Sequence, residues 1–569
     1  MTNADGPRLA QTALRVTRPV ELIIPLTIAL VMTAIAQRWS GLDTPDSSFY
    51  ASLALFGDEV TDRAPFTSYY WTRLGYIAPV SALTAILGPF PGFLAYKFLL
   101  TSAISVSAFL TVRRHTRTWI ATWLAAAVVS STVILSYLGN SYLTGSVLAG
   151  TSILIALSTT PRHPRASAAL AGTTMGWLVM VNPPGALLAG TLWLALTIHT
   201  HRTNMAVPIW HQIAIATGTT IGAFAAFLAI GKIMFPAMNW FAAYQDAQQI
   251  TLSNFSSPTA VWLQDISLLV PAAVLIITVI TWFFTRHSSA AQQALIISVA
   301  SVAFMLVFNP LMGGIALEAP MYQSMLWPPA LIALCLAATT RLADNVSSSR
   351  IPQLVAALGI IGIVAAGYVA PGIELPLGIG LALAVTALVL FTPRTTTATL
   401  LTMATFLAGA QLLQNSRDDL GLYYLSPYHW AYASNPIETK VRTAVNSQEW
   451  LLNNTDSTDQ ILLWVDGPWT QGDRELYVAA GMQLWGENRI TLEPTLTDDY
   501  GLNKLETIQP DVLALYGKSM DSVMTFWESI PKAKDPSAPI CYDYAWPADS
   551  SSDFPTTQGH TCLTRLSWK

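Results

Sequence analysis

Apolar runs of about 17–25 residues recur along this chain as far as about residue 414. Wound as an α-helix, a run of this length crosses the hydrocarbon core of a bilayer, which is about 30 Å thick. Only 11% of the 569 residues are charged and 52% are hydrophobic. A soluble protein of this size carries roughly twice that charged fraction. The chain is therefore expected to be a polytopic α-helical membrane protein.

Beyond residue 414 the long apolar runs stop and the composition becomes polar. Residues 1–414 contain 18 Lys and Arg against 12 Asp and Glu, whereas residues 415–569 contain 11 against 21. We therefore expect a transmembrane domain over 1–414 and an acidic soluble α/β domain over 415–569, with buried strands at QILLWVD and DVLALYG. The acidic tail gives no sign of nucleic-acid binding.

The basic residues predict the topology. Arg8, Arg15 and Arg18 precede the first apolar run, which places the N-terminus in the cytoplasm and the following loop outside. The segment 71–90 is expected to lie in the outer interface, because a crossing there would carry the RRHTR cluster at 113–117 to the outer face. Thirteen spans then place the C-terminal domain outside a cell (plasma) membrane. The spans are expected at about 20–37, 91–112, 118–137, 143–160, 166–182, 184–199, 210–234, 266–284, 291–308, 320–340, 352–370, 375–392 and 396–414.

Several charged residues depart from this topology signal, and all of them fall at the outer face. The basic ones are Arg38, Arg63, Arg73, Lys97 and Lys232. Acidic residues gather in the first outer loop, within 38–90: Asp43, Asp46, Asp58, Glu59 and Asp62. Ionisable residues in such positions are typical of functional sites in membrane proteins, and a solvated loop is the alternative.

The stretch DTPDSSFYASLALFG in this loop is predicted to form a short helix. Thr44 can cap its N-terminus, Pro45 fits the first helical position, and Gly57 can end it. Asp43, Asp46 and Tyr50 are then spaced i, i+3 and i+7 and share one face. An aspartate in a first turn also complements the helix dipole, so a purely structural role is the alternative.

This stretch resembles the first-loop signature of the GT-C superfamily of polyprenyl-phosphate-sugar-dependent glycosyltransferases. The likeness is closest to the branch of protein O-mannosyltransferases and the lipid A aminoarabinose transferase, whose pattern is roughly P-D-E-x-x-Y-A. Pro45, Asp46, Tyr50 and Ala51 match, and Ser47 replaces the second acidic residue. The following FTSYYWTRLGYIAPVSALTAILG resembles that branch's next element, an aromatic-rich interfacial helix.

Two later stretches, VNPPGALLAG and APMYQSMLWPPALIAL, resemble the branch in shape. Asn182 and Gln323 stand there where cations are usual, which leaves the donor identity open. The resemblance implies substrate contacts by Tyr50, Tyr322 and Gln323.

The resemblance implies a hexosyl- or pentosyltransferase that moves a sugar from a polyprenyl-phosphate donor to a glycan, lipid or protein acceptor at the outer face, in cell-wall biogenesis. Asp46 is the expected general base, with Asp43 as a neighbouring carboxylate. The leaving phosphate needs cations, for which the candidates are Arg63, Arg73, Lys97 and Lys232. A divalent cation, Mg²⁺ or Mn²⁺, held by Asp43 and Asp46 is left open.

Other functions compete with this one. A transporter or flippase of lipid-linked glycans would place ionisable groups near the bilayer midplane and show internal repeats, which are not found here. A polymerase or ligase of surface polysaccharide would share the substrates. The sequence names neither the sugar nor the acceptor, and leaves metal dependence and oligomeric state open. In the outer domain, Cys541 and Cys562 are expected to form a disulfide.

Overall fold

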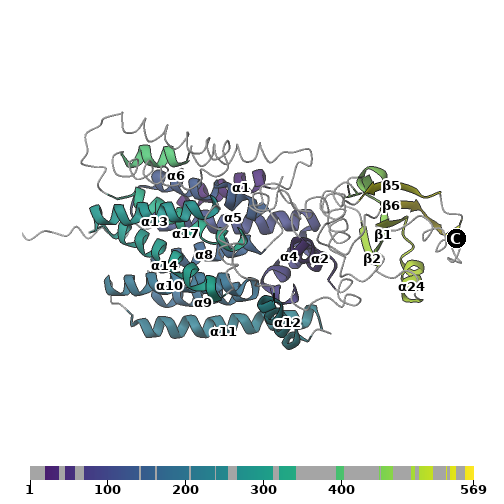
Figure 1. The fold of residues 1–569 in the computed structure, drawn as a ribbon, viewed down its shortest axis with the longest axis horizontal. Helices are drawn as coiled ribbons and strands as arrows, with labels where there is room; N and C mark the ends of the chain where they lie inside the picture. Colours follow the sequence, from purple (N-terminus) through teal and green to yellow (C-terminus); the bar gives the residue numbers. More distant parts are fainter. Residues whose placement is uncertain are drawn as a thin grey trace, which may run out of the picture.

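The computed structural model describes two parts of the chain: an elongated helical bundle and a small β-sheet at one end of it (Figure 1). The described residues are 19–36, 45–57, 70–139, 143–159, 163–203, 207–236, 239–253, 266–286, 288–311, 320–340, 393–402, 447–448, 450–465, 489–493, 499–516, 533–534, 538–545 and 558–568. The expected boundary near 414 falls outside them.

The bundle is built mostly from long apolar helices. Its elements are η1 (Pro19–Leu22), α1 (Ile23–Ala36), α2 (Pro45–Phe56), η3 (Tyr70–Arg73), α4 (Leu74–Leu87), α5 (Pro89–Arg113), α6 (Thr118–Val129), α7 (Thr132–Gly139), α8 (Thr144–Thr159), α9 (Pro164–Val181), α10 (Pro183–Thr203), α11 (Ile209–Met234), α12 (Trp240–Ser253), α13 (Ile266–Thr285), α14 (Ser289–Leu311), α16 (Pro320–Ser324) and α17 (Trp327–Ala338). Among the described residues, α5, α11 and α14 are long and apolar enough to cross a membrane. The chain is a membrane protein.

Most predicted spans in the described ranges correspond to helices, but two of them are interrupted. The expected span 320–340 is two helices, α16 and α17, with a turn between them. The expected span 118–137 is two helices, α6 and α7. They separate at two serines, where the Ser131 N–H donates to the Val128 carbonyl, three residues back, and so tightens the turn. The predicted spans 352–370 and 375–392 lie outside the described residues, so the count of thirteen stays a prediction. Helix α12 was not predicted.

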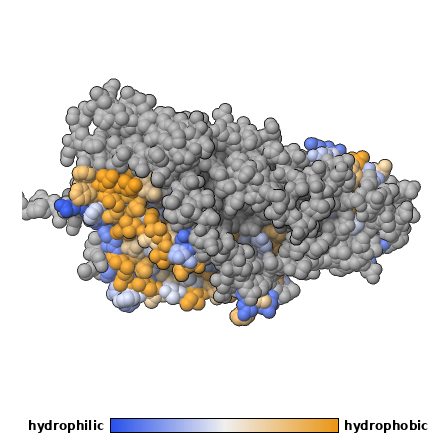
Figure 2. Space-filling view, viewed as in Figure 1, coloured by the Kyte–Doolittle hydropathy of each residue, from blue (hydrophilic) through white to orange (hydrophobic). Residues whose placement is uncertain are grey.

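Glycine allows two helices to pack unusually closely. A Cβ atom on Gly172 of α9 would lie 2.0 Å from Thr219 Oγ1 and 2.1 Å from the Ala216 carbonyl oxygen of α11. The Thr220 hydroxyl donates across this contact to the Gly172 carbonyl at 3.0 Å. Small residues that let backbones approach are the usual packing device between membrane helices. The remaining surface of α11 is largely exposed and contributes to the hydrophobic surface of the bundle, part of which Figure 2 shows.

The sheet belongs to the predicted C-terminal α/β domain, and its strand order is β2-β1-β3-β6-β5. β1 pairs in parallel with both β2 and β3, whereas β6 pairs antiparallel with β3 and β5. The elements are β1 (Gln460–Val465), β2 (Arg489–Glu493), α24 (Asp499–Ile508), β3 (Val512–Tyr516), β5 (Ile540–Ala545) and β6 (Gln558–Arg565), with a separate pair of β4 (Ala533–Lys534) and β7 (Ser567–Trp568). The two predicted strands are therefore confirmed as β1 and β3.

Side chains alternate across this sheet, as expected for strands buried on both faces. On one face, residues of β1 and β3 pack with Leu505 of α24: Leu462, Trp464, Leu513 and Leu515. On the other face, Ile461, Leu463, Val512 and Ala514 join a continuous core of buried side chains that also contains residues of α2 and α4. The sheet and the helical bundle are thus linked by one hydrophobic core.

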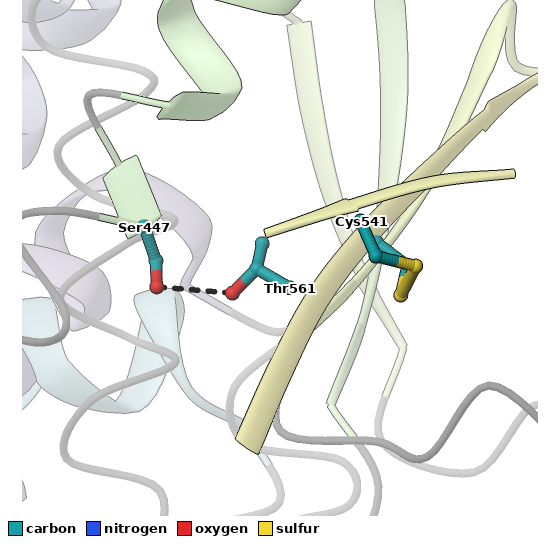
Figure 3. Close-up of a disulfide and its surroundings, with 4 residues drawn as sticks. Ser447, Cys541 and Thr561 are labelled. Carbon is teal, nitrogen blue, oxygen red and sulfur yellow. Dashed lines mark hydrogen bonds between the residues drawn. A yellow bond between two sulfur atoms is a disulfide. The ribbon is translucent and has the colours of Figure 1, made fainter. Parts of the chain in front are cut away.

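A disulfide joins the two strands at one edge of this sheet. Cys541 on β5 and Cys562 on β6 are direct cross-strand neighbours and are bonded, as the sequence predicted (Figure 3). Next to Cys562, the Thr561 hydroxyl bonds the Ser447 hydroxyl at 3.0 Å and ties β6 to the segment before β1. The remaining cysteine, Cys335, is a buried free thiol in α17.

Candidate functional site

The first-loop motif forms the predicted helix. Pro45 is the first residue of α2, and Gly57 follows its last residue with a positive φ of 44°, a conformation that favours glycine. Asp46 is the second residue of α2, one helical turn before Tyr50. The structure describes the backbone of Asp46 but not its side chain. Asp43 and Arg63 lie wholly outside the described residues.

Four tyrosines, here called the tyrosine ladder, fix α2 against the next elements. The Tyr50 ring, which is fully buried, contacts Tyr70 of η3 at 5.5 Å and Tyr76 of α4 at 6.1 Å between ring centroids. Tyr76 contacts Tyr96 of α5 at 5.6 Å, and the Tyr96 hydroxyl bonds Ser146 of α8 at 2.8 Å. Edge-to-face contacts of this kind favour one relative orientation of the rings. The motif helix is therefore held in a defined place against η3 and α4, and through Tyr76 it is connected to α5.

Two buried cations lie at this end of the bundle. Arg73, at the junction of η3 and α4, is 8% exposed, and Lys97, the residue after Tyr96 on α5, is 5% exposed. Helices α2, α4 and α12 lie at the end of the bundle nearest the sheet (Figure 1). A buried charge in a membrane protein is expensive and marks a functional site by default.

A third buried cation has a different place and role. Arg113 lies 16 residues after Lys97 on α5, about 24 Å further along the helix axis. Its guanidinium forms an ion pair with Glu21 at 3.2 Å and donates to the Thr116 carbonyl at 3.1 Å. Arg113 thus joins η1 to the α5–α6 turn at the opposite end, whereas Arg73 and Lys97 share the end that carries the motif.

The phenol of Tyr244 on α12 lies near Arg73. Burial raises the pKa of Tyr244, and the positive charge of Arg73 opposes this shift by favouring the phenolate. The Tyr244 hydroxyl also contacts Met180 Sδ at 3.2 Å, which holds α12 against α9. Arg73 is therefore close to α12 as well as to α4.

The other predicted residues lie on α11 and α16, and Gly231, the residue before Lys232, packs against Leu74, the residue after Arg73. Lys232 is exposed at the end of α11 and donates to the Pro236 carbonyl just beyond its own helix. Gln323 is fully buried on α16, and Tyr322 contacts Phe308 of α14 at 6.5 Å between ring centroids. The structure thus brings Tyr50, Arg73 and Lys97 onto neighbouring elements.

Sequence reasoning included Tyr76 only as part of the aromatic-rich segment after α2 and did not single out Tyr96, Tyr244 or Trp177 of α9. The aromatic residues of that segment were a local signal for Tyr76, and the place of Tyr96 directly before Lys97 was a local signal for Tyr96. As to metals, no group of three or more His, Cys, Asp or Glu side chains in the described ranges can hold an ion. The carboxylates of Asp43 and Asp46 are not among these described side chains.

No protein-family model and no curated protein matches the sequence. Among solved structures, the chain is similar to ArnT from Cupriavidus metallidurans bound to undecaprenyl phosphate, at 13% identity and a TM-score of 0.49, covering 96% of this chain and 98% of that one. The apo state of the same ArnT gives 11% identity and a TM-score of 0.44, with coverages of 95% and 97%. The Archaeoglobus fulgidus oligosaccharyltransferase gives 11% identity and a TM-score of 0.37, covering 87% of this chain and 69% of that one. Because all these scores are below 0.5, we take the function from the residues of this chain.

Proposed function

We propose that this chain is a membrane glycosyltransferase that moves a sugar from a polyprenyl-phosphate donor to a cell-envelope acceptor at the outer face. The observation that carries the proposal is the PDSSFYA motif on α2, whose Tyr50 packs through the tyrosine ladder toward two buried cations, Arg73 and Lys97. Sugar transfer from a lipid phosphate needs a base for the acceptor hydroxyl and cations for the leaving phosphate. The motif and the cations supply both.

In the proposed reaction, the acceptor hydroxyl oxygen attacks the anomeric carbon of the sugar and forms the new glycosidic bond. The bond between that carbon and the phosphate oxygen breaks, and the polyprenyl phosphate leaves with the electron pair. Asp46 takes the hydroxyl proton. Arg73 and Lys97 stabilise the negative charge that grows on the leaving phosphate. The sugar, a hexose or a pentose, and the acceptor are not fixed by these residues.

The proposed topology places the N-terminus in the cytoplasm and the motif helix and the sheet outside, in a multi-pass plasma-membrane protein. The positive-inside distribution of arginines supports this orientation. It brings α2, η3 and the start of α4 to the outer boundary, where a lipid phosphate and a hydrophilic acceptor can meet. A divalent cation, if one takes part, would bind the loop carboxylates Asp43 and Asp46 and would help to neutralise the phosphate.

The test is turnover by the purified full chain in nanodiscs, with polyprenyl-phosphate-linked hexose and pentose donors and an extract of cell-envelope acceptors. Asp46→Asn is expected to keep binding polyprenyl phosphate and to lose about 10²–10⁴-fold in rate, because an amide does not accept the proton. Asp43→Asn should lose less turnover unless a metal takes part, in which case added Mg²⁺ or Mn²⁺ should partly restore it.

The matched control for Asp46→Asn is Asp499→Asn, which also removes an acid from the first turn of a helix, α24, but in the C-terminal domain. The control should retain wild-type turnover. If Asp46→Asn also turns over normally with only a small loss of stability, Asp46 has a helix-dipole role and the proposal fails.

A further inference from the structure

A proline inside α4 leaves one backbone carbonyl without its helical donor. In an α-helix the carbonyl of residue i accepts the N–H of residue i+4, and Pro79 has no N–H to offer the Gly75 carbonyl. The indole Nε1 of Trp177, on α9, donates to this carbonyl at 2.8 Å. A side chain 102 residues away thus supplies the hydrogen bond that Pro79 removes from the helix.

The same carbonyl lies at a very close approach of two backbones. A Cβ atom on Gly75 would lie 2.7 Å from the Trp177 carbonyl oxygen and 2.7 Å from Val181 Cγ2, so only glycine fits here. On the other side, a Cβ atom on Gly231 of α11 would lie 2.4 Å from Leu74 Cδ1 and 2.6 Å from Trp240 Cζ2. The first turn of α4 therefore packs between α9 and α11, with the Gly75 backbone against α9 and the Leu74 side chain against α11.

Arg73 immediately precedes this turn. The two residues that follow it, Leu74 and Gly75, make the close contacts just described, and Trp71 before it contacts Phe235 at 4.7 Å between ring centroids. The Arg73 side chain is itself buried. A change in the position of the Gly75 backbone must therefore move the origin of the Arg73 side chain.

We propose that Trp177 is a positioning residue for Arg73: its indole N–H replaces the donor missing at Pro79 and so fixes the start of α4 and the guanidinium carried there. This inference rests on the proposed function, since Arg73 binds the donor phosphate only within it. Trp177→Phe keeps an aromatic ring in place but leaves the Gly75 carbonyl without a donor. Misplacement of a binding group by about 1 Å can lower a rate by about 10²-fold, so a loss of polyprenyl-phosphate affinity of tenfold or more is expected.

Pro79 gives the inference a rescue experiment. In Pro79→Ala the new backbone N–H at position 79 can bond the Gly75 carbonyl, because α4 is already continuous through this residue. Pro79→Ala alone should therefore bind normally, and Pro79→Ala combined with Trp177→Phe should recover both affinity and thermal stability. A purely structural packing role for Trp177 does not predict rescue by a residue on the other helix.

The experiment measures polyprenyl-phosphate affinity and unfolding temperature for the full chain in nanodiscs. The control is Trp193→Phe, a buried tryptophan of α10 outside this junction, which should bind as the wild type does. The affinity for polyprenyl phosphate should fall in Trp177→Phe. The double variant Arg73→Ala with Trp177→Phe should bind as weakly as Arg73→Ala alone, because the positioned side chain is already absent. If Trp177→Phe alone fails to fold, the double variant with Pro79→Ala should still fold and bind, and failure of that variant overturns the inference.

Two outcomes separate the inference from the proposed function. Normal affinity in Trp177→Phe, or no rescue by Pro79→Ala, overturns the positioning role while leaving the glycosyltransferase proposal intact. Normal affinity in Arg73→Ala removes Arg73 from the donor site and with it the positioning role, even if Pro79→Ala restores the unfolding temperature of Trp177→Phe.

Discussion

His115 gives the sharpest prediction about stability. It lies in the turn between α5 and α6, and its Nε2 bonds the side-chain oxygen Oε1 of Gln293 on α14 at 3.2 Å. Burial lowers the pKa of His115 from 6.5 to about 4; the bond to Gln293 opposes this shift, and the neighbouring Arg114 adds to it. The folded protein therefore holds His115 neutral at pH 7 and at pH 5.

The size of the effect follows from the two pKa values. Between pH 6.5 and pH 4 the unfolded chain binds a proton at this histidine and the folded chain does not, so the free energy of unfolding falls as the pH is lowered. From pH 7 to pH 5 the loss through His115 is about 2 kcal/mol. His115→Gln keeps a polar side chain but cannot titrate, so its free energy of unfolding should fall by about 2 kcal/mol less over the same interval.

Cys335 provides the assay. The other two cysteines form the disulfide, so a thiol-reactive dye reports the exposure of this one buried thiol as the bundle unfolds. Unfolding is followed at pH 7 and pH 5 for the wild type, His115→Gln and His211→Gln. The last is a control, because His211 is exposed at the start of α11. Equal pH dependence in the wild type and His115→Gln would refute the reasoning.

Two further predictions concern the disulfide and the topology. Replacing Cys541 and Cys562 by serine should lower the stability of the sheet by about 3 kcal/mol on the loop-entropy model, and free thiols at both positions in non-reduced protein would contradict the pairing. Cysteines introduced at 38–44 should react with a membrane-impermeant reagent on whole cells, and one introduced at position 117, which is exposed in the structure, should not. Reaction at position 117 would reverse the proposed orientation.

Much of the helical architecture could be predicted because it depends on local sequence. Apolar runs of membrane length gave α5, α11 and α14, and the Pro45 and Gly57 signals gave the bounds of α2. The break in the predicted span 118–137 was missed, because Ser130 and Ser131 are tolerated inside membrane helices and give only a weak stop signal. Helix α12 was missed because its apolar residues gather at its first turns, after which the sequence becomes polar and resembles a loop.

The candidate site could be predicted only in its sequence-local part. The motif drew attention to Tyr50, and charges at the outer face drew attention to Arg73 and Lys97. The contacts that join them come from residues far apart in sequence, such as Tyr50 with Tyr76 and Gly75 with Trp177. No spacing rule within one chain indicates which tryptophan will donate to a carbonyl freed by a proline, because the partner is chosen by helix packing.

Asn182 stands where a cation is usual in the resembling family, and its hydrogen bond gives a structural reason for an amide at this position. Its side-chain oxygen Oδ1 accepts the Gly185 N–H at 3.0 Å and so caps the start of α10 directly after α9 ends. A lysine side chain has no acceptor and could not make this bond. At this position the chain therefore uses an amide to satisfy backbone donors of α10. Under the proposed function, the charge for the donor phosphate must then come from cations elsewhere at the same end of the bundle, and Arg73 and Lys97 are the buried ones among the described residues there.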